Sequence, residues 1–240
     1  ILQHDVCPLA RMLQLAQKYG QGEMRRPVEI EFAVNFDART KSGVFYLLQI
    51  RPMIDVKAGL EEDLSVIPDE KLLLKSENSL GHGVMDDIQD VIYVKTEGYS
   101  ASNNQLIAYD IEKLNRRFLD EWKHYILVGP GRWGSSDTWL GIPVKWPNIS
   151  AARIIVEAGL TNYRVDPSQG THFFQYQTSF GVGYFTINAY KNDGIYNQAL
   201  LDSMPAVEET KYLRWVRFEK PLSVKMDGKK KLGVVELPED

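Results

Sequence analysis

The sequence predicts an α/β fold of α+β character, because three kinds of segment interleave along the chain. Short apolar stretches bounded by turn residues, such as 124–131, have the length and composition of buried strands. Stretches with apolar residues three and four positions apart, such as 108–122, have the period of an amphipathic helix. The tail over 212–237 is rich in strand-forming residues. This order favours one large or two small mixed domains.

Composition narrows the classes of function. The 240 residues are 44% hydrophobic and 25% charged, which is typical of a soluble globular protein. The net charge of −4 indicates neither a nucleic-acid surface nor an acidic-membrane surface. The single cysteine, Cys7, excludes an internal disulfide and fits a reducing compartment. We see no secretory signal and no apolar run near the roughly 18–20 residues that span a bilayer, and we expect a cytoplasmic protein.

The first elements form a compact pattern of a helix followed by a hairpin. The stretch 5–22 has helical spacing, and we expect Asp5 to cap it and Gly20 and Gly22 to end it. The first residue is Ile1 rather than methionine, so we expect a piece of a longer polypeptide, cut just before this helix.

Residues 28–34 and 44–52 follow as two extended segments joined by a polar loop, which predicts a β-hairpin. The stretch 55–70 is acidic and has no clean period, which is typical of a linker. We therefore expect a first domain segment at 1–55, a linker at 56–70 and a second domain at 71–240.

The second domain opens with predicted strands and a helix. Residues 71–77 and 90–96 read as strands, 108–122 as a helix and 124–131 as a strand that runs into a glycine-rich turn. The stretch 152–159 is a buried strand or a helix leading into one.

The rest of the second domain mixes helix and strand. We expect helices at 171–180 and 192–204 and an extended segment at 181–190. In the tail, Asp227 and Gly228 predict a two-residue hairpin turn. The tryptophans Trp122, Trp133, Trp139 and Trp146 are expected in the core rather than on a nucleic-acid stacking platform.

The hairpin carries the first group of candidate site residues. Side chains alternate between the faces of a strand, so Glu29 and Glu31 share one face, and Gln49 and Arg51 share a face with Phe45 and Leu47. If the register matches, carboxylates and a guanidinium meet on one surface, where they suit Mg²⁺ and phosphate oxygens. The alternative is a solvated hairpin face with a cross-strand Glu–Arg pair that contributes little.

The stretch VEIEFAV…VFYLLQIRPM, with the helix LARMLQLAQKYG before it, resembles the closing segment of an ATP-grasp domain. The family is that of phosphoenolpyruvate synthase and pyruvate phosphate dikinase, in which the segment reads D-I-E-[FW], a hairpin, and L-x-x-L-Q-x-R-P. The resemblance covers roughly residues 7–53. It implies that Glu31 ligates the Mg²⁺ of MgATP and that Gln49 and Arg51 contact the nucleotide phosphates, with Glu29 in the place of the family's Asp.

The stretch QGTHFF, between two predicted strands, resembles the histidine turn of the swivelling β/β/α domain of the same family. Its signature is G-G-x-T-[SC]-H-A-A followed by LGIP, and here Gly181 follows His172 by nine positions. The resemblance implies that His172 carries a phosphoryl group. A neutral imidazole attacks phosphorus, and a nearby cation stabilises the product, for which Arg132 and Arg153 are candidates. The alternative is a histidine packed among aromatic residues.

The stretch GPGRWGSSD, which contains Arg132, leaves two interpretations open. Three glycines after a strand can expose N–H groups to an anion, although the P-loop spacing is absent. A tight turn that holds Trp133 in the core explains the glycines equally well. His82, in LGHG, is a further candidate phosphate acceptor or a plain loop histidine.

The resemblance predicts part of an ATP-dependent phosphotransferase that uses ATP and Mg²⁺. A pyruvate-like acceptor and upstream domains of the same polypeptide would be its partners, with no nucleic acid and no membrane. We expect this chain to be inactive in isolation, since the phosphate-clamping residues of the family lie upstream. The alternative is a non-catalytic regulatory or interaction module, which the bulky Phe173 and Phe174 after His172 favour.

Overall fold

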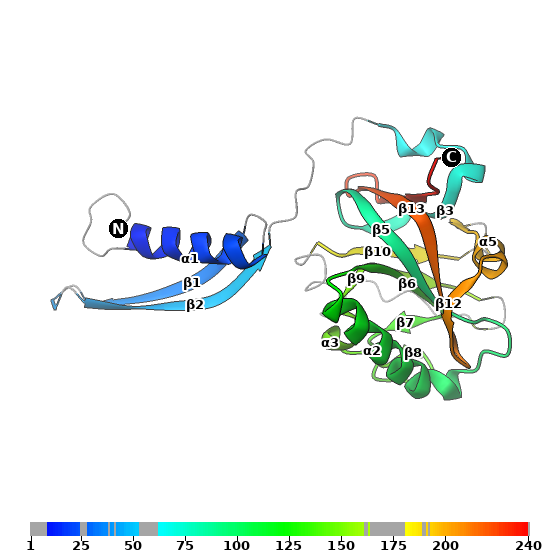
Figure 1. Cartoon of the computed structure of the whole chain (residues 1–240), viewed down its shortest axis with the longest axis horizontal. Helices are drawn as coiled ribbons and strands as arrows, with labels where there is room; N and C mark the ends of the chain where they lie inside the picture. Colours follow the sequence, from blue (N-terminus) through cyan, green and yellow to red (C-terminus); the bar gives the residue numbers. More distant parts are fainter. Residues whose placement is uncertain are drawn as a thin grey trace. The chain divides into compact units, whose positions relative to one another are not determined.

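The computed structural model describes residues 9–24, 28–37, 39–40, 42–52, 62–160, 163, 181–188, 191 and 193–239. The chain divides into two compact units, Ile1–Asp55 and Val56–Asp240. Its fold is mixed α/β, with a strand-rich second unit and few helices among the described residues (Figure 1).

The first unit is a helix packed on a two-stranded hairpin, as the sequence predicts (Figure 1). Its elements are α1 (Leu9–Met24), β1 (Val28–Asp37) and β2 (Ser42–Pro52). The expectation that Gly20 and Gly22 end the helix is wrong, because α1 continues through both. A Cβ at Gly20 would lie 2.2 Å from Cδ1 of Ile50, so this glycine lets the helix approach the hairpin. Asp5 and Cys7 lie outside the described residues.

The segment predicted as a linker is folded from residue 62 onward, which corrects that expectation. It forms two short 3-10 turns, η1 (Leu64–Val66) and η2 (Asp69–Lys71). Leu64 and Ile67 are buried and pack with Leu72, Leu232 and Val234. These two apolar residues therefore attach the acidic stretch to the core of the second unit.

The second unit is built on one mixed sheet. In the described residues it has ten strands, in the order β11-β3-β14-β13-β5-β6-β9-β10-β4, with β12 added beside β13. Its longer strands are β3 (Leu72–Ser76), β5 (Gly83–Val94), β6 (Tyr125–Gly129), β9 (Ala152–Ala158), β10 (Gly183–Ile187), β13 (Leu213–Asp227) and β14 (Leu232–Glu236). Its shorter strands are β4 (Asn78–Leu80), β11 (Ile195–Tyr196) and β12 (Ala206–Glu209). The strands β5, β6, β9 and β10 are parallel, and the others pair antiparallel.

This sheet closes on itself. The consecutive strands β3 and β4 pair with β14 on one side and with β11 and β10 on the other. The hydroxyl of Ser76, at the join, donates to the carbonyl of Thr186 at 2.7 Å and so ties β3 to β10. The parallel half and the antiparallel half thus face each other across one apolar interior.

The parallel strands have a core on each side. The interior core includes Val91, Ile126, Val156 and Phe185, and Leu201 from α5 (Gln198–Ser203) packs into it. The outer core lies under α2 (Asn104–Asp120) and α3 (Trp146–Ile149), which cover the same side of the sheet (Figure 1). Because both faces are buried, strands such as β6 read as continuous apolar runs.

Several expectations for this unit need correction. The helix predicted over 192–204 begins only at Gln198, because Ile195 and Tyr196 pair with β3 as β11. The Asp227–Gly228 turn is wrong as well: Asp227 pairs with Leu232, so the loop is the four residues 228–231. The stretch 152–159 forms the buried strand β9, which decides between its two interpretations. The helix predicted over 171–180 lies outside the described residues.

Two of the four tryptophans expected in the core are exposed instead. Trp133 is buried and Trp146 packs against the outer core. Trp122 and Trp139, in contrast, are 87% and 68% exposed, so their assignment to the core is wrong. Within the described part of the chain, no helix is both long enough and apolar enough to cross a membrane.

Candidate functional site

The register of the hairpin brings the first group of candidate residues together. Glu29 pairs with Arg51, and Glu31 pairs with Gln49. Residues directly opposite each other in an antiparallel pair share a face, so these four positions lie on one face of the hairpin. For Arg51 the structure describes the backbone position alone.

A β-bulge puts this polar face on the side of the hairpin opposite to the stacked rings of Phe32 and Phe45. Leu48 has no partner in the register, because Glu31 pairs with Gln49 while Phe32 pairs with Leu47. The bulge shifts the alternation by one residue. Phe45 and Leu47 therefore lie on the face opposite to Gln49, which corrects the strict alternation expected from sequence. The rings of Phe32 and Phe45 stack there at 5.4 Å.

A pocket of about 280 Å³ lies at this polar face, and its described lining is Glu29, Ile30, Glu31 and Gln49. The carboxylates of Glu29 and Glu31 are exposed, and Gln49 is half-buried. Two carboxylates beside an amide oxygen are hard oxygen donors of the kind that Mg²⁺ accepts when substrate phosphates and water complete its shell. Among the described residues, no cluster of three or more acidic, histidine or cysteine side chains can hold a metal by itself.

The glycine-rich stretch around Arg132 is a tight turn with a buried tryptophan. The indole Nε1 of Trp133 donates to the carbonyl of Val156 at 2.9 Å, and its backbone N–H donates to Oε1 of Glu157 at 3.3 Å. Gly131 and Gly134 have positive φ angles of 70° and 74°, which favour glycine. The interpretation of the stretch as a turn that holds Trp133 in the core is confirmed.

Arg132 lies in the short strand β7 (Arg132–Trp133), which pairs with β8 (Gly141–Ile142). The two strands are in close contact, since a Cβ at Gly141 would lie 1.9 Å from the carbonyl oxygen of Arg132. Tyr163 packs over the turn, with its hydroxyl donating to the carbonyl of Trp139 at 2.7 Å. Burial raises the pKa of Tyr163, which keeps the phenol a hydrogen-bond donor. The backbone around Arg132 is therefore held in one conformation.

The turn sits at the carboxyl edge of the parallel strands. Gly129, the last residue of β6, is in register with Glu157 near the end of β9. Ligand sites in sheets with parallel strands gather at this edge. His172 follows β9 in the sequence but lies outside the described residues. Its phosphorylation stays a prediction.

The two candidate cations lie at opposite ends of the parallel strands. Arg132 follows the carboxyl end of β6, whereas Arg153 lies at the amino end of β9. There its Nη2 is 3.0 Å from Nε2 of His124. A single phosphoryl group could therefore contact only one of these two arginines.

No family model matches the chain, and neither a curated protein nor a solved structure matches it.

Glu157 is the residue that sequence reasoning missed. It is buried, at 4% exposed, and belongs to a strand whose neighbours are apolar. A buried carboxylate at the end of a parallel strand indicates a structural or functional role. The signal in the sequence was the single acidic residue inside the run ARIIVEA.

His82 lies away from this edge. It precedes the amino end of β5, it is exposed, and its Nδ1 accepts the backbone N–H of Gly228 at 3.3 Å. These contacts are those of a loop histidine that supports the neighbouring hairpin turn.

Proposed function

We propose that this chain is part of an ATP-dependent phosphotransferase that resembles phosphoenolpyruvate synthase and pyruvate phosphate dikinase. The hairpin would contribute part of a MgATP site, and the second unit would be a swivelling phosphohistidine-like domain. The observation that carries the proposal is the hairpin register, which sets Glu29 opposite Arg51 and Glu31 opposite Gln49 on one face beside a pocket. We place this activity in the cytoplasm.

Each hairpin residue has a distinct role in this proposal. The planar guanidinium of Arg51 binds phosphate oxygens of the nucleotide, and the amide of Gln49 donates a further hydrogen bond to them. Glu31, supported by Glu29, holds the metal ion. Bound Mg²⁺ supplies neutralisation of the charge that develops on the phosphates during transfer. Residues from upstream domains would complete the nucleotide site.

The arrangement of the second unit supports the carrier role. A parallel half, an antiparallel half and helices on one outer side are what we would expect of a swivelling domain with β/β/α layers, and they support the proposal. In the transfer, a neutral ring nitrogen of His172 would attack phosphorus as the bond to the leaving phosphate oxygen breaks, and Arg132 would offset the charge left on that oxygen. The phosphoryl group then passes to a pyruvate-like acceptor in the complete protein.

Labelled ATP tests the carrier directly. The full-length protein is incubated with β- or γ-labelled ATP and Mg²⁺, and acid-labile protein-bound label is counted. We expect label in the parent and in His82→Ala, and none in His172→Ala. Label that persists in His172→Ala, or that never forms, overturns the carrier role.

Arg51→Ala tests the hairpin independently of the histidine. A lost phosphate contact of this kind is worth about 1.5–3 kcal/mol, so ATP-dependent activity of the complete protein should fall by at least about tenfold. Arg39→Ala is the matched control, because Arg39 lies in the loop at the far end of the same hairpin. Equal rates in both variants would make the hairpin face structural.

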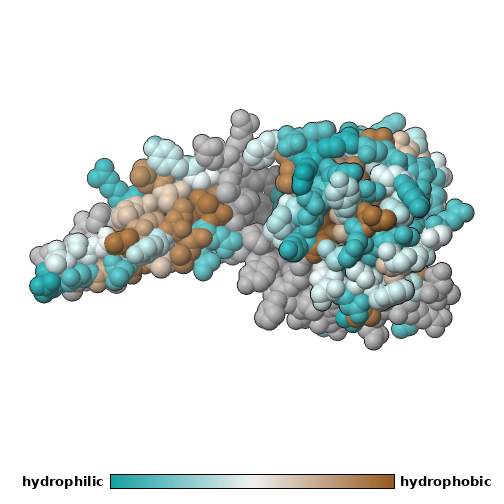
Figure 2. Space-filling model, turned by 90° about the horizontal axis from the view of Figure 1, so that it is seen from below, coloured by the Kyte–Doolittle hydropathy of each residue, from teal (hydrophilic) through white to brown (hydrophobic). Residues whose placement is uncertain are grey.

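A non-catalytic interaction module is the second candidate, and the surface of the first unit favours it. Val44, Tyr46 and Leu48 of β2 are each about half exposed or more, at 53%, 49% and 61%. Figure 2 shows apolar residues gathered over this unit. An exposed apolar surface of this kind is typical of a protein-binding face. Absence of label together with retained binding to the upstream domains would support this function.

A further inference from the structure

A second pocket, of about 460 Å³, lies in the second unit at the carboxyl end of β5. Its volume falls within the roughly 300–1,000 Å³ of small-molecule sites. The wall contains three cations and three carboxylates, drawn from the end of β5, from α5 and from the β12–β13 hairpin. These residues are Lys95, Glu97, Asp202, Glu209, Lys211 and Arg214.

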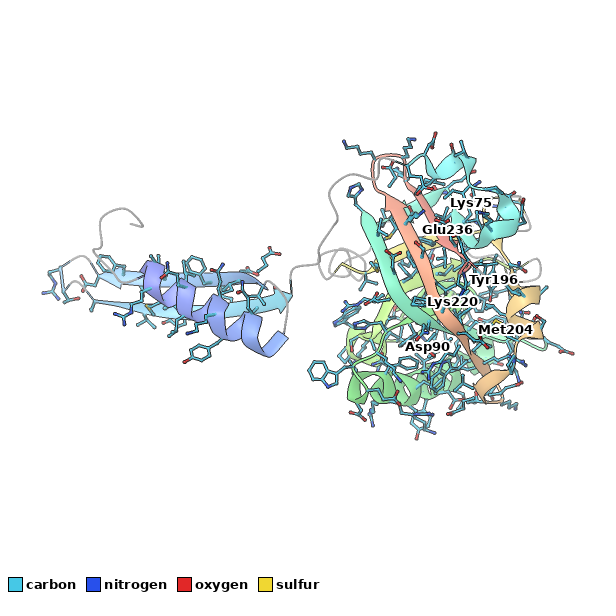
Figure 3. All side chains as sticks on the ribbon, turned by 45° about the horizontal axis from the view of Figure 1, so that its top comes forward. Lys75, Asp90, Tyr196, Met204, Lys220 and Glu236 are labelled. Atoms are coloured by element: carbon cyan, nitrogen blue, oxygen red, sulfur yellow. The ribbon has the colours of Figure 1, made fainter. Side chains whose placement is uncertain are left out.

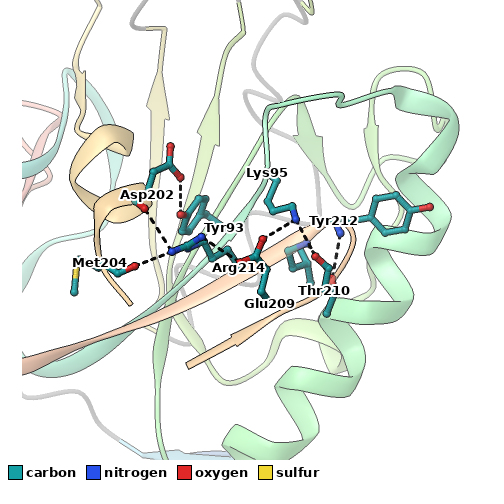
Figure 4. A network of polar contacts seen from close by, with 9 residues as sticks. Tyr93, Lys95, Asp202, Met204, Glu209, Thr210, Tyr212 and Arg214 are labelled. Atoms are coloured by element: carbon teal, nitrogen blue, oxygen red, sulfur yellow. Dashed lines mark hydrogen bonds and ion pairs between the residues drawn. The ribbon is translucent and has the colours of Figure 1, made fainter. Parts of the chain in front are cut away.

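Part of this wall is held in place by a polar network (Figure 4). The carboxylate of Glu209 bridges two cations, with Oε1 2.8 Å from Nζ of Lys95 and Oε2 3.1 Å from Nη1 of Arg214. The other terminal nitrogen of Arg214 donates to the carbonyl of Met204 at 2.7 Å, just beyond α5. The network therefore joins three elements, so the pocket exists before any ligand binds.

Asp202 is a hydrogen-bond acceptor in the pocket wall, and a contact with Tyr93 holds its carboxylate in place. Its Oδ1 accepts the hydroxyl of Tyr93 at 2.7 Å. Burial and this hydrogen bond raise the pKa of Tyr93, so the phenol remains a donor. This hydrogen bond fixes the orientation of the Asp202 carboxylate and leaves its Oδ2 for another donor.

Some hydrogen-bond donors and acceptors in the pocket wall are not used by contacts within the described part of the protein. Among the described residues, the side chains of Lys211 and Glu97 make no ion pair, and Nε of Arg214 is buried without an acceptor. Because this Nε has essentially no accessible surface, the charged groups that remain open to a ligand are those of Lys211 and Glu97. The pocket thus offers unused donors and unused acceptors within one cavity.

We propose that this pocket binds a small zwitterion of the free amino-acid class. The ligand's carboxylate contacts Lys211, and its ammonium group contacts Glu97 and Asp202. A dianion would face three carboxylates and a diamine would face three cations, whereas a ligand with one charge of each sign meets both sets favourably. The predominantly polar wall further selects a small or polar side chain, since an apolar one would leave polar groups unpaired.

This site is distinct from the hairpin pocket, and the proposal does not depend on phosphoryl transfer. It lies at the same edge of the parallel strands as the turn around Arg132, because β5 and β6 are adjacent and end together.

Thermal unfolding of the full chain with individual free L-amino acids tests the proposal, with titration calorimetry on those that shift Tm. Succinate and putrescine serve as the dianion and dication probes. We expect Tm to rise with one or more small or polar amino acids and to stay constant with the two controls, since a ligand that binds only the folded state stabilises it. A Tm that no amino acid changes, or that succinate or putrescine raises equally, overturns the zwitterion site.

Variants of two exposed wall residues test whether the ligand contacts this wall. Lys211→Met and Glu97→Gln alter exposed side chains with no ion pair among the described residues, so both should fold like the parent. Each should weaken the Kd of the bound amino acid by at least about tenfold. Lys229→Met is the control, since Lys229 is exposed in the 228–231 turn. An unchanged Kd in both pocket variants would place the ligand elsewhere and overturn the assignment.

Discussion

Asp90 shows how a single side chain is stabilised inside the second unit. It is 3% exposed, comes from β5, and is labelled in Figure 3. Its Oδ1 accepts from Nε1 of Trp215 at 2.6 Å and from Nε of Arg217 at 2.7 Å, and its Oδ2 accepts from Nη2 of Arg217 at 3.2 Å. A buried charge with this many donors is stable only while they remain.

We expect Asp90→Ala to lower the free energy of unfolding by about 2–3 kcal/mol, because it leaves a partly buried guanidinium and an indole N–H unpaired. Asp86→Ala on the same strand is the control. Asp86 is exposed and accepts from the hydroxyl of Ser223, so the loss should be about 0.5 kcal/mol or less. Urea unfolding measures both, and equal losses would contradict the role given to Asp90.

Asp63 gives a pH-dependent prediction at the same scale. The hydroxyl of Ser65, Nζ of Lys230 and the backbone N–H of Ser65 donate to its carboxylate and lower its pKa to about 2. A carboxyl with a lowered folded-state pKa adds stability above its unfolded-state pKa, near 3.9, and that stability is lost as pH falls through about 2. We expect an NMR titration midpoint near 2 for Asp63, moving upward in Ser65→Ala. A midpoint near 3.9 in the parent would contradict these contacts.

At the scale of elements, two local features decide how the chain is organised. The bulge at Leu48 puts Gln49 and Phe45 on opposite faces of β2, so the polar candidate site is separated from the stacked aromatics. The turns η1 and η2 attach residues 62–71 to the second unit through Leu64 and Ile67.

Because η1 is attached through a buried leucine, alanine substitutions at two of its three residues should lower the stability by different amounts. Leu64 is 1% exposed and Val66 is 73% exposed. Leu64→Ala should lower the free energy of unfolding by about 2–4 kcal/mol through lost burial and the cavity left behind. Val66→Ala should cost about 0.5 kcal/mol or less. If residues 62–70 were a linker, chemical denaturation would show no difference between the two variants.

At the scale of the whole molecule, the two units differ in how many buried apolar side chains they contain. Among the described residues, Leu9 and Val28 are the buried apolar side chains of the first unit, and the second unit holds the rest. A unit of about 55 residues with so small a core is marginal by itself.

A chain of residues 56–240 should therefore keep the cooperative thermal transition of the full chain, with Tm within about 3 °C. A peptide of residues 1–55 should show no cooperative transition by circular dichroism. Loss of the transition in 56–240 would mean that the second unit needs the first to fold.

The sequence by itself determined the types of most described elements, because periodicity reports burial directly: β6 and β9 are apolar runs, and α2 has helical spacing. It also predicted that Glu29 and Glu31 share one face of their strand, whereas the register that sets them opposite Arg51 and Gln49 came from the structure. Only the tertiary structure decided the bulge at Leu48, the burial of Leu64, the exposure of Trp122 and the closure of the sheet through Ser76. These depend on partners far away in the chain, whose contacts no local pattern encodes. The pocket between β5, α5 and the β12–β13 hairpin is of the same kind, because residues 95 and 214 become neighbours only when β5 and β13 pair.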